Sequence, residues 1–273
     1  SDAATHRASP TPPTTATGTP PATPDRPSSK PTPKPTRKST HPAARKPAPK
    51  PAPPRTTARP SRSTPRPPVK PAGLPLDQPT GSATQVITAV APTATADTAT
   101  VQAWTRQGST WQPATGPITA HVGTDGLTTQ PTESRSATPI GSFTLTQAFG
   151  AAGNPGTALP YLQTTPSDWW ISQPGPLYNT HQRCASDCAF IQGDPNEHLF
   201  YETPSYNYGV VIDYNTANAG PIVPGAGSAF FLHVYAGIPS AGCVAIPQEN
   251  LVSILRWLNP AAHPRILIGV GGQ

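Results

Sequence analysis

The chain has 273 residues, of which 41 are proline and none is methionine, and its formal net charge is +6. Residues 1–72 hold 14 of the 19 Lys and Arg with two acids, whereas residues 73–273 hold five Arg with 11 acids. The first part therefore carries +12 and the second −6. Because the part able to form a core is acidic, a basic nucleic-acid-binding fold is excluded.

Residues 1–72 have the composition of a disordered tail. They contain no aromatic residue and cycle through Pro, Thr, Ala, Lys and Arg, as in residues 30–35. Such a segment buries too little apolar surface to offset the entropy of ordering, so we expect a tail with local polyproline II structure. It is either a solvated spacer or a segment that attracts polyanions, which could be nucleic acid, anionic lipid or wall polymer. The start at Ser1 suggests that a signal peptide or anchor has been removed.

The remaining residues predict one mainly β domain with few helices. We expect a linker at 73–96 and a domain over 97–273. Leu251, Ile254, Leu255 and Leu258 follow a helical period between Pro247 and Pro260. Short runs separated by Gly, Pro, Asn and Asp predict the strands Thr100–Arg106, Thr119–Val122, Ser142–Thr146, Gly209–Tyr214, Ser228–Val234 and Arg265–Val270. No run of apolar residues is long enough for a membrane span.

The three cysteines divide into a close pair and a single residue. Cys184 and Cys188 lie four residues apart, a spacing that lets a turn or helix bring the two sulfur atoms together. A zinc site that adds His181 and His198 is the alternative, although the spacing matches no familiar zinc finger. The spacing therefore favours a disulfide, which leaves Cys243 unpaired.

Cys243 follows a histidine at a distance that permits thiol catalysis. His233 ends an apolar run, Gly237 and Pro239 break the chain after it, and Gly242 precedes Cys243. A strand, a loop and a tight return would bring the imidazole and the thiol together, as nucleophilic catalysis requires. The backbone N–H of Gly242 would then face an oxyanion. On spacing alone, a buried and inert thiol is an equally good interpretation.

The segments Gly227–His233 and Ser240–Val244 together resemble the signature of the L,D-transpeptidases, the YkuD family, in which a strand histidine precedes Ser/Thr-x-Gly-Cys. Further stretches look similar to one branch of that family, namely Ala137–Phe143, Trp169-Trp170 with Tyr178-Asn179, and Tyr208–Asn215. The likeness covers roughly residues 97–270. Many members have a second histidine where this chain has Ala241 and a polar residue where it has Ala245.

The resemblance implies a β-sandwich-like catalytic domain that acts on peptidoglycan stem peptides outside the cytoplasm. Cys243 takes the place of the nucleophile and His233 that of the general base, with no metal or organic cofactor. The candidate substrate-binding residues are Ser240, Asn215 and Tyr235. We expect a monomer that forms 3→3 cross-links or acts as an L,D-carboxypeptidase. The alternative is a non-catalytic wall-binding module that uses the basic tail as its adhesive.

Overall fold

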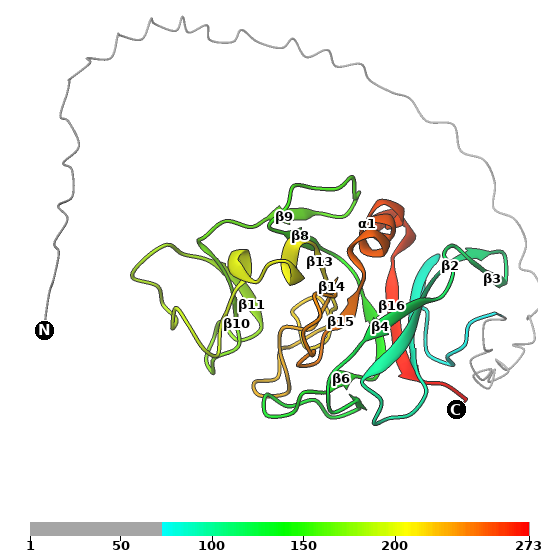
Figure 1. The fold of residues 1–273 in the computed structure, drawn as a ribbon, viewed down its shortest axis with the longest axis horizontal. Coiled ribbons are helices and arrows are strands. Elements are labelled where there is room, and N and C mark those ends of the chain that lie inside the picture. The colour runs from blue at the N-terminus through cyan, green and yellow to red at the C-terminus, as the bar shows by residue number, and fades with distance from the viewer. Residues whose placement is uncertain (1–72, 273) are drawn as a thin grey trace, which may run out of the picture. The chain divides into compact units, whose positions relative to one another are not determined.

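The computed structural model describes residues 73–272, which are mainly β with one α-helix, as predicted (Figure 1). The predicted disordered tail, residues 1–72, lies outside the described residues. The main sheet has the order β7-β16-β1-β2-β4-β15-β14-β13-β8-β9, with β3 paired to β2. Its strands are β1 (Gln85–Ala91), β2 (Thr98–Gln107), β3 (Thr110–Pro113), β4 (Ile118–His121), β7 (Gly141–Thr144), β8 (Ala148–Gly150), β9 (Tyr161–Gln163), β13 (Gly209–Val211), β14 (Phe231–Val234), β15 (Val244–Ile246) and β16 (Arg265–Val270).

Strand β1 corrects the predicted linker at residues 73–96. It lies between β16, to which it is parallel, and β2, to which it is antiparallel, and only Val90 among its residues is not buried. Upstream of it, Leu74 and Leu76 are buried in a cluster with Trp111. The folded part therefore starts well before Asp97. This strand was missed because its few large apolar residues lie in a Thr- and Ala-rich stretch and, with both faces buried, do not alternate with polar residues.

The α-helix packs its apolar side into the core of the curled main sheet. Helix α1 (Gln248–Trp257) begins after Pro247, and Leu251, Ile254 and Leu255 are fully buried. They share one hydrophobic cluster with side chains from β1, β2, β4, β13, β14, β15 and β16, so one core joins strands from much of the sheet. Short 3₁₀ turns complete the helical content: η1 (Leu199–Tyr201), η2 (Ser205–Asn207) and η3 (Pro260–Ala262). No helix among residues 73–272 is long and apolar enough to cross a membrane.

Two smaller sheets flank the main sheet. One pairs β5 (Leu127–Thr128) with β6 (Thr138–Pro139). The other has the order β11-β10-β12, from β10 (Asp168–Ile171), β11 (Thr180–Arg183) and β12 (Glu197–His198). Asp168 is fully buried in this sheet and accepts hydrogen bonds from His181, Arg183 and Thr165. Burial alone would raise the pKa of the Asp168 carboxyl, but these donors outweigh it and hold the pKa below the usual range.

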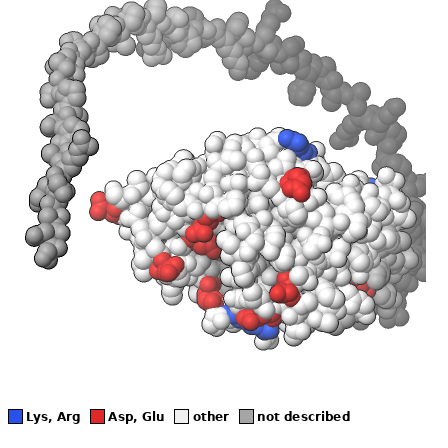
Figure 2. Space-filling view, in the orientation of Figure 1, with Lys and Arg blue, Asp and Glu red and all other residues white. Residues whose placement is uncertain are grey.

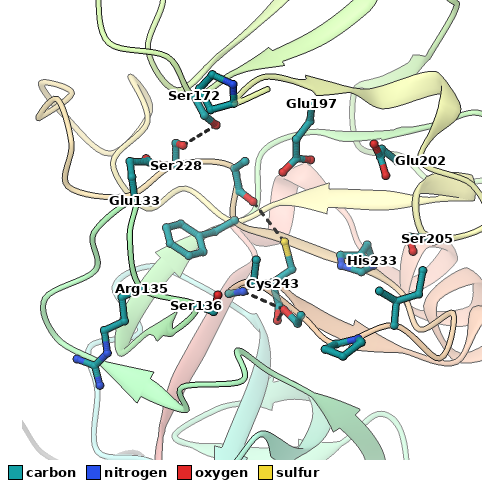
Figure 3. Close-up of a pocket in the computed structure, with 18 of the residues that line it drawn as sticks. Glu133, Arg135, Ser136, Ser172, Glu197, Glu202, Ser205, Ser228, His233 and Cys243 are labelled. Atoms are coloured by element: carbon teal, nitrogen blue, oxygen red, sulfur yellow. Dashed lines mark hydrogen bonds between the residues drawn. The ribbon is translucent and has the colours of Figure 1, made fainter. Parts of the chain in front are cut away.

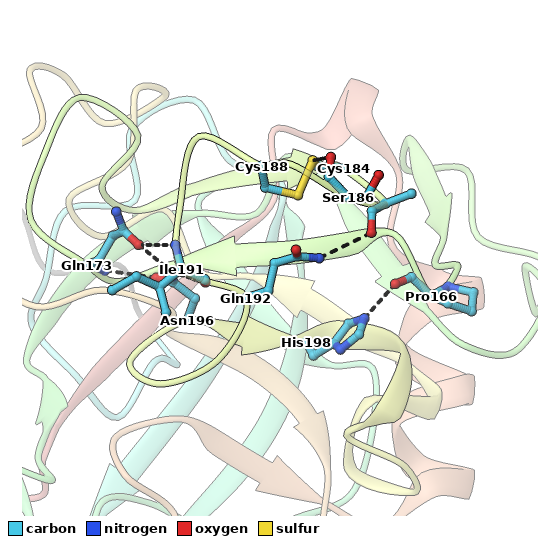
Figure 4. Close-up of a disulfide and its surroundings, with 10 residues drawn as sticks. Pro166, Gln173, Cys184, Ser186, Cys188, Ile191, Gln192, Asn196 and His198 are labelled. Atoms are coloured by element: carbon cyan, nitrogen blue, oxygen red, sulfur yellow. Dashed lines mark hydrogen bonds between the residues drawn. A yellow bond between two sulfur atoms is a disulfide. The ribbon is translucent and has the colours of Figure 1, made fainter.

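The loop after β11 is closed by the Cys184–Cys188 disulfide, with the two Cα atoms 5.8 Å apart (Figure 4). The histidines of the alternative zinc site have other partners. His181 Nε2 lies 2.7 Å from the Asp168 carboxylate, and His198 Nε2 lies 2.6 Å from the Pro166 carbonyl oxygen. The structure therefore has the predicted disulfide at this pair.

Candidate active site

The parallel pairing of β14 and β15 brings Cys243 and His233 to one place. His233 lies within β14 opposite Ala245, and Cys243 immediately precedes β15. The connection between the strands contains Gly237 and Pro239, and a bridge from Ser240 to Gly123 fixes its far end. The structure thus has the strand, the loop and the tight return that the sequence predicted between His233 and Cys243.

Both side chains line a cavity of about 470 Å³ (Figure 3). The wall is mostly polar and comes from five parts of the chain: the β5–β6 connection, the residue after β10, β12 with the segments on either side of it, β14 with the residues before it, and the connection between β14 and β15. Within it the Cys243 side chain is buried, with 8% of its surface exposed. A small acylating group that enters this cavity can therefore reach the thiol.

The Cys243 thiol is protonated in its resting environment. Its Sγ–H donates to the Ala229 carbonyl oxygen and its Sγ accepts from the Phe231 N–H, both at 3.3 Å. Burial raises the pKa of the thiol strongly, and the charge of Glu197 adds to this effect. The Phe231 N–H and the Tyr206 hydroxyl act in the opposite direction, because both can donate to a thiolate.

His233 is held in the tautomer that a general base needs. Its Nδ1 lies 2.8 Å from the Val234 carbonyl oxygen, and since a carbonyl only accepts, Nδ1 carries the proton and Nε2 has the free lone pair. Burial lowers the pKa of the imidazole, so it is neutral at neutral pH. No hydrogen bond joins this ring to Sγ within residues 73–272. The resting pair is a neutral thiol beside a neutral imidazole.

The backbone that accepts the hydrogen bond of the thiol is held in an unusual conformation by Asn179. Ala229 has φ 58°, in the left-handed region that a non-glycine residue rarely adopts. Its N–H donates to Asn179 Oδ1 at 3.0 Å, and the same oxygen accepts from Trp170 Nε1 at 2.8 Å. Asn179 Nδ2 in turn donates to the Asn215 carbonyl oxygen at 2.7 Å. Trp170 and Asn179, singled out in the sequence by resemblance, are thus part of the scaffold of the site.

Gly242 and Ser240 shape the turn before Cys243 in a way that the sequence did not predict. The Gly242 N–H donates to Ser240 Oγ at 3.0 Å, and that hydroxyl donates to the Cys243 carbonyl oxygen at 2.7 Å. The Gly242 N–H predicted to face an oxyanion therefore has an internal partner in the resting state. Ser240 is buried and lines the cavity, but its hydroxyl is engaged in the turn rather than free for substrate.

Two of the predicted substrate-binding residues lie outside the cavity. The Asn215 side chain bonds the backbone of Val223 and Gly227, and so ties its own loop together. Tyr235 stacks on His121, with ring centroids 3.8 Å apart. Neither residue is among those that line the cavity around Cys243. Both residues follow a predicted strand, and the sequence does not show which side of the sheet the end of a strand faces.

Two further residues that line the cavity were not singled out in the sequence analysis. Glu197, on β12, and Tyr206, in η2, line the cavity beside Cys243 and are hydrogen-bonded to each other through the Tyr206 hydroxyl. Burial raises the pKa of Glu197 to about 7, with further increases from Glu202 and Glu133, whereas Tyr206 lowers it. No motif in the sequence marks these residues, because only the fold places the three-stranded sheet beside β14.

A comparison with protein families finds one match. The model of the YkuD family, the L,D-transpeptidase catalytic domain, matches residues 91–268, a range that includes His233 and Cys243. No curated protein and no solved structure matches the chain significantly. The family match covers more than half of the chain and agrees with the arrangement of thiol and imidazole described above. The chain therefore belongs to the YkuD family of L,D-transpeptidase catalytic domains.

Proposed function

We propose that this protein is a peptidoglycan L,D-transpeptidase in which Cys243 is the nucleophile and His233 the general base. The observation that carries the proposal is the unpaired Cys243 thiol beside a neutral imidazole in a polar cavity. Family membership supports a peptidoglycan substrate. Such a substrate is a wall polymer, so we place the protein outside the cytoplasm, where the Cys184–Cys188 disulfide is also chemically favoured.

In the first half-reaction, Sγ attacks the carbonyl carbon of an L-centre residue in a stem tetrapeptide. Because the thiol is protonated at rest, its proton passes to His233 Nε2 as the S–C bond forms. The C–N bond to the terminal D-alanine then breaks, and the imidazolium gives the proton to the leaving amine. The products are a thioester on Cys243 and free D-alanine.

In the second half-reaction, the amine of a neighbouring stem attacks the thioester. The amine loses a proton to His233, the new amide forms and the thiol is regenerated. Diaminopimelate as both donor and acceptor residue gives a 3→3 cross-link, and water in place of the amine gives carboxypeptidase activity. Gly242 can bind the oxyanion of either tetrahedral intermediate only if its N–H exchanges Ser240 Oγ for the substrate oxygen.

The first test is intact-protein mass after incubation with a carbapenem-type β-lactam. The native protein should gain one adduct, and Cys243→Ala should gain none, because no second thiol is free. His233→Ala should acylate about 10²–10⁴-fold more slowly at neutral pH and partly recover as the pH rises. His121→Phe is the matched control, since His121 is also a strand histidine but lies outside the cavity.

The second test separates the enzyme from a non-catalytic wall-binding module. Muropeptides from isolated walls incubated with the protein should contain new 3→3 cross-links or shortened stems, as seen by mass spectrometry. A wall-binding module leaves the muropeptide profile unchanged and gives no β-lactam adduct. An adduct that forms equally well on Cys243→Ala would contradict the assignment of the nucleophile.

A further inference from the structure

The Glu197–Tyr206 pair contacts the groups that hold both the thiol and the base. The Tyr206 hydroxyl donates to the Glu197 carboxylate. The Tyr206 ring packs edge-on against Phe231 and His233, with centroids 5.5 and 5.3 Å apart. Phe231 is also the residue whose N–H donates to Cys243 Sγ. A change of charge on this pair therefore changes the pKa of the Cys243 thiol.

Glu197 reaches the cavity because the three-stranded sheet packs against β14. On β12, Glu197 pairs with Trp170 of β10, and the Trp170 ring packs edge-on against Phe231 with centroids 5.1 Å apart. Figure 3 shows the Glu197 carboxylate directed into the cavity on the side where Cys243 and His233 lie. This arrangement fixes a carboxylate beside a nucleophile that must become an anion.

The charge at Glu197 opposes ionisation of Cys243. Burial is the larger cause of the raised thiol pKa and the Glu197 charge is the next. The pKa of Glu197 is itself near neutrality, at about 7, so this opposing charge is present only above that pH. The titratable and charged groups that face this part of the cavity are His233 of β14, Glu197 of β12, Tyr206 of η2, Glu202 between η1 and η2, and Glu133 and Arg135 of the β5–β6 connection.

The other charged groups leave the field at Cys243 negative. Glu133 accepts a hydrogen bond from Tyr178, and its charge and that of Glu202 add to the raised pKa of Glu197. Arg135 donates to Thr128 Oγ1 at 3.1 Å, and Figure 3 shows its guanidinium directed away from Cys243. Before His233 takes the thiol proton, a positive charge that offsets Glu197 must therefore come from the substrate.

We propose that Glu197 adds to the barrier against ionisation of the Cys243 thiol until a cationic group of the substrate binds beside Glu197 and offsets its charge. The inference rests on the proposed function, because it assigns a substrate preference to the same nucleophile. The substrates favoured are peptides with a free ammonium group close to the carbonyl that is attacked. Once this ammonium neutralises Glu197, the thiol proton passes to His233 Nε2 as described above, and no further reactant is needed.

The main test measures alkylation of Cys243 by neutral iodoacetamide, without reductant, from about pH 5.5 to about pH 9. Glu197→Gln keeps an acceptor for the Tyr206 hydroxyl and removes the charge. Its rate should equal that of the native protein below about pH 6 and exceed it by roughly tenfold above about pH 8, because only ionised Glu197 opposes the thiolate. Glu249→Gln is the control for a lost charge, since Glu249 is exposed in the first turn of α1 and does not line the cavity.

A second variant covers the case in which Glu197→Gln does not fold. Tyr206→Phe keeps the ring and removes the hydroxyl that lowers the pKa of Glu197. The pH at which the native alkylation rate bends, near 7, should therefore move to higher pH. Thiolate absorbance near 240 nm, with Cys243→Ala as the blank, should show the same change in ionisation. A bend that stays in place in Tyr206→Phe would argue against Glu197 as its source.

Charged reagents test the preference for a cationic group. The native protein should react faster with 2-aminoethyl methanethiosulfonate than with its 2-sulfonatoethyl analogue, and Glu197→Gln should lose most of this difference while Glu249→Gln keeps it. Equal alkylation of Glu197→Gln and the native protein across the pH range would overturn the inference. If the native protein shows neither β-lactam acylation nor wall chemistry while Glu197→Gln still changes the alkylation rate, the proposed function is rejected and the electrostatic control of the thiol stands.

Discussion

At Gly242 the backbone conformation and the neighbouring atoms leave no room for a side chain. Its φ is 144°, and a Cβ at this position would lie 2.6 Å from the Phe230 ring and 3.0 Å from the Ala137 carbonyl oxygen. Gly242→Ala should therefore combine backbone strain with a clash and destabilise the domain by about 1–3 kcal/mol. We expect a lower unfolding temperature in calorimetry and slower β-lactam acylation of Cys243.

Gly237→Ala separates the two effects. Gly237 also has a positive φ, 75°, but a Cβ there meets no atom within 4 Å. This variant should show only the cost of the strained backbone, about 1 kcal/mol, and should acylate like the native protein. If Gly237→Ala impairs acylation as much as Gly242→Ala does, the slower acylation of Gly242→Ala does not come from the clash with Phe230.

At the same scale, the sequence predicted that His233 and Cys243 lie near one another but not what surrounds them. The interval between the two residues and the glycine before the cysteine indicated this proximity, because a short loop between two paired strands determines where both side chains go. Glu197 could not be predicted, because its place in the cavity depends on the packing of Trp170 against Phe231. Asn215 lies outside the cavity because its side chain bonds its own loop, and nothing in a single sequence indicates that bonding.

At the scale of secondary structure, a β-branched apolar run and flanking prolines predicted β16 and the helix, whereas β1 and β12 were missed. Strand β16 has the predicted bounds, Arg265–Val270, and the helix is Gln248–Trp257, between the two prolines that predicted its ends. Strand β1 was assigned to a linker although it is central in the sheet. The short strand β12, which carries Glu197, has only two residues and is defined by its partner β10, so no local pattern could reveal it.

The Cys184–Cys188 disulfide should stabilise the segment that presents Glu197 without being needed for chemistry at Cys243. Both cysteines pack against the cluster of Trp169, Ile171 and Phe190 on and next to the three-stranded sheet. Replacing both cysteines with serine reopens a loop of about five residues. By the chain-entropy relation, this lowers the free energy of unfolding by roughly 2 kcal/mol. We expect an unfolding temperature lower by about 4–8 °C in calorimetry.

The double variant Cys184→Ser/Cys188→Ser should still be acylated at Cys243, because β14 and β15 belong to the main sheet. Peptide mapping without reductant should find Cys243 as the sole alkylated residue of the native chain. Alkylated Cys184 in native protein, or stoichiometric zinc bound to it, would contradict the disulfide and its role.

At the scale of the whole molecule, charge divides the chain into two parts with different affinities. The described residues contain five Arg and 11 acids, and Figure 2 shows acidic side chains outnumbering basic ones on the face in view. Residues 1–72 carry the opposite charge, +12. We therefore expect the acidic cavity wall to favour cationic groups of a substrate, and the N-terminal part to attract an anionic polymer.

Removal of residues 1–72 should lower binding to isolated anionic walls and make the remaining binding less dependent on salt, since most of the basic charge is lost. The unfolding temperature and the β-lactam acylation rate should not change, because the removed part contains no aromatic residue with which to dock on the core. Cosedimentation with walls over a salt series measures the first effect.

As a matched control, replacing Lys30, Lys34, Lys38, Lys46 and Lys50 with glutamine in the full chain should reproduce part of the loss at constant length. If truncation alone weakens binding and the glutamine variant binds like the native protein, length rather than charge is what the N-terminal part contributes.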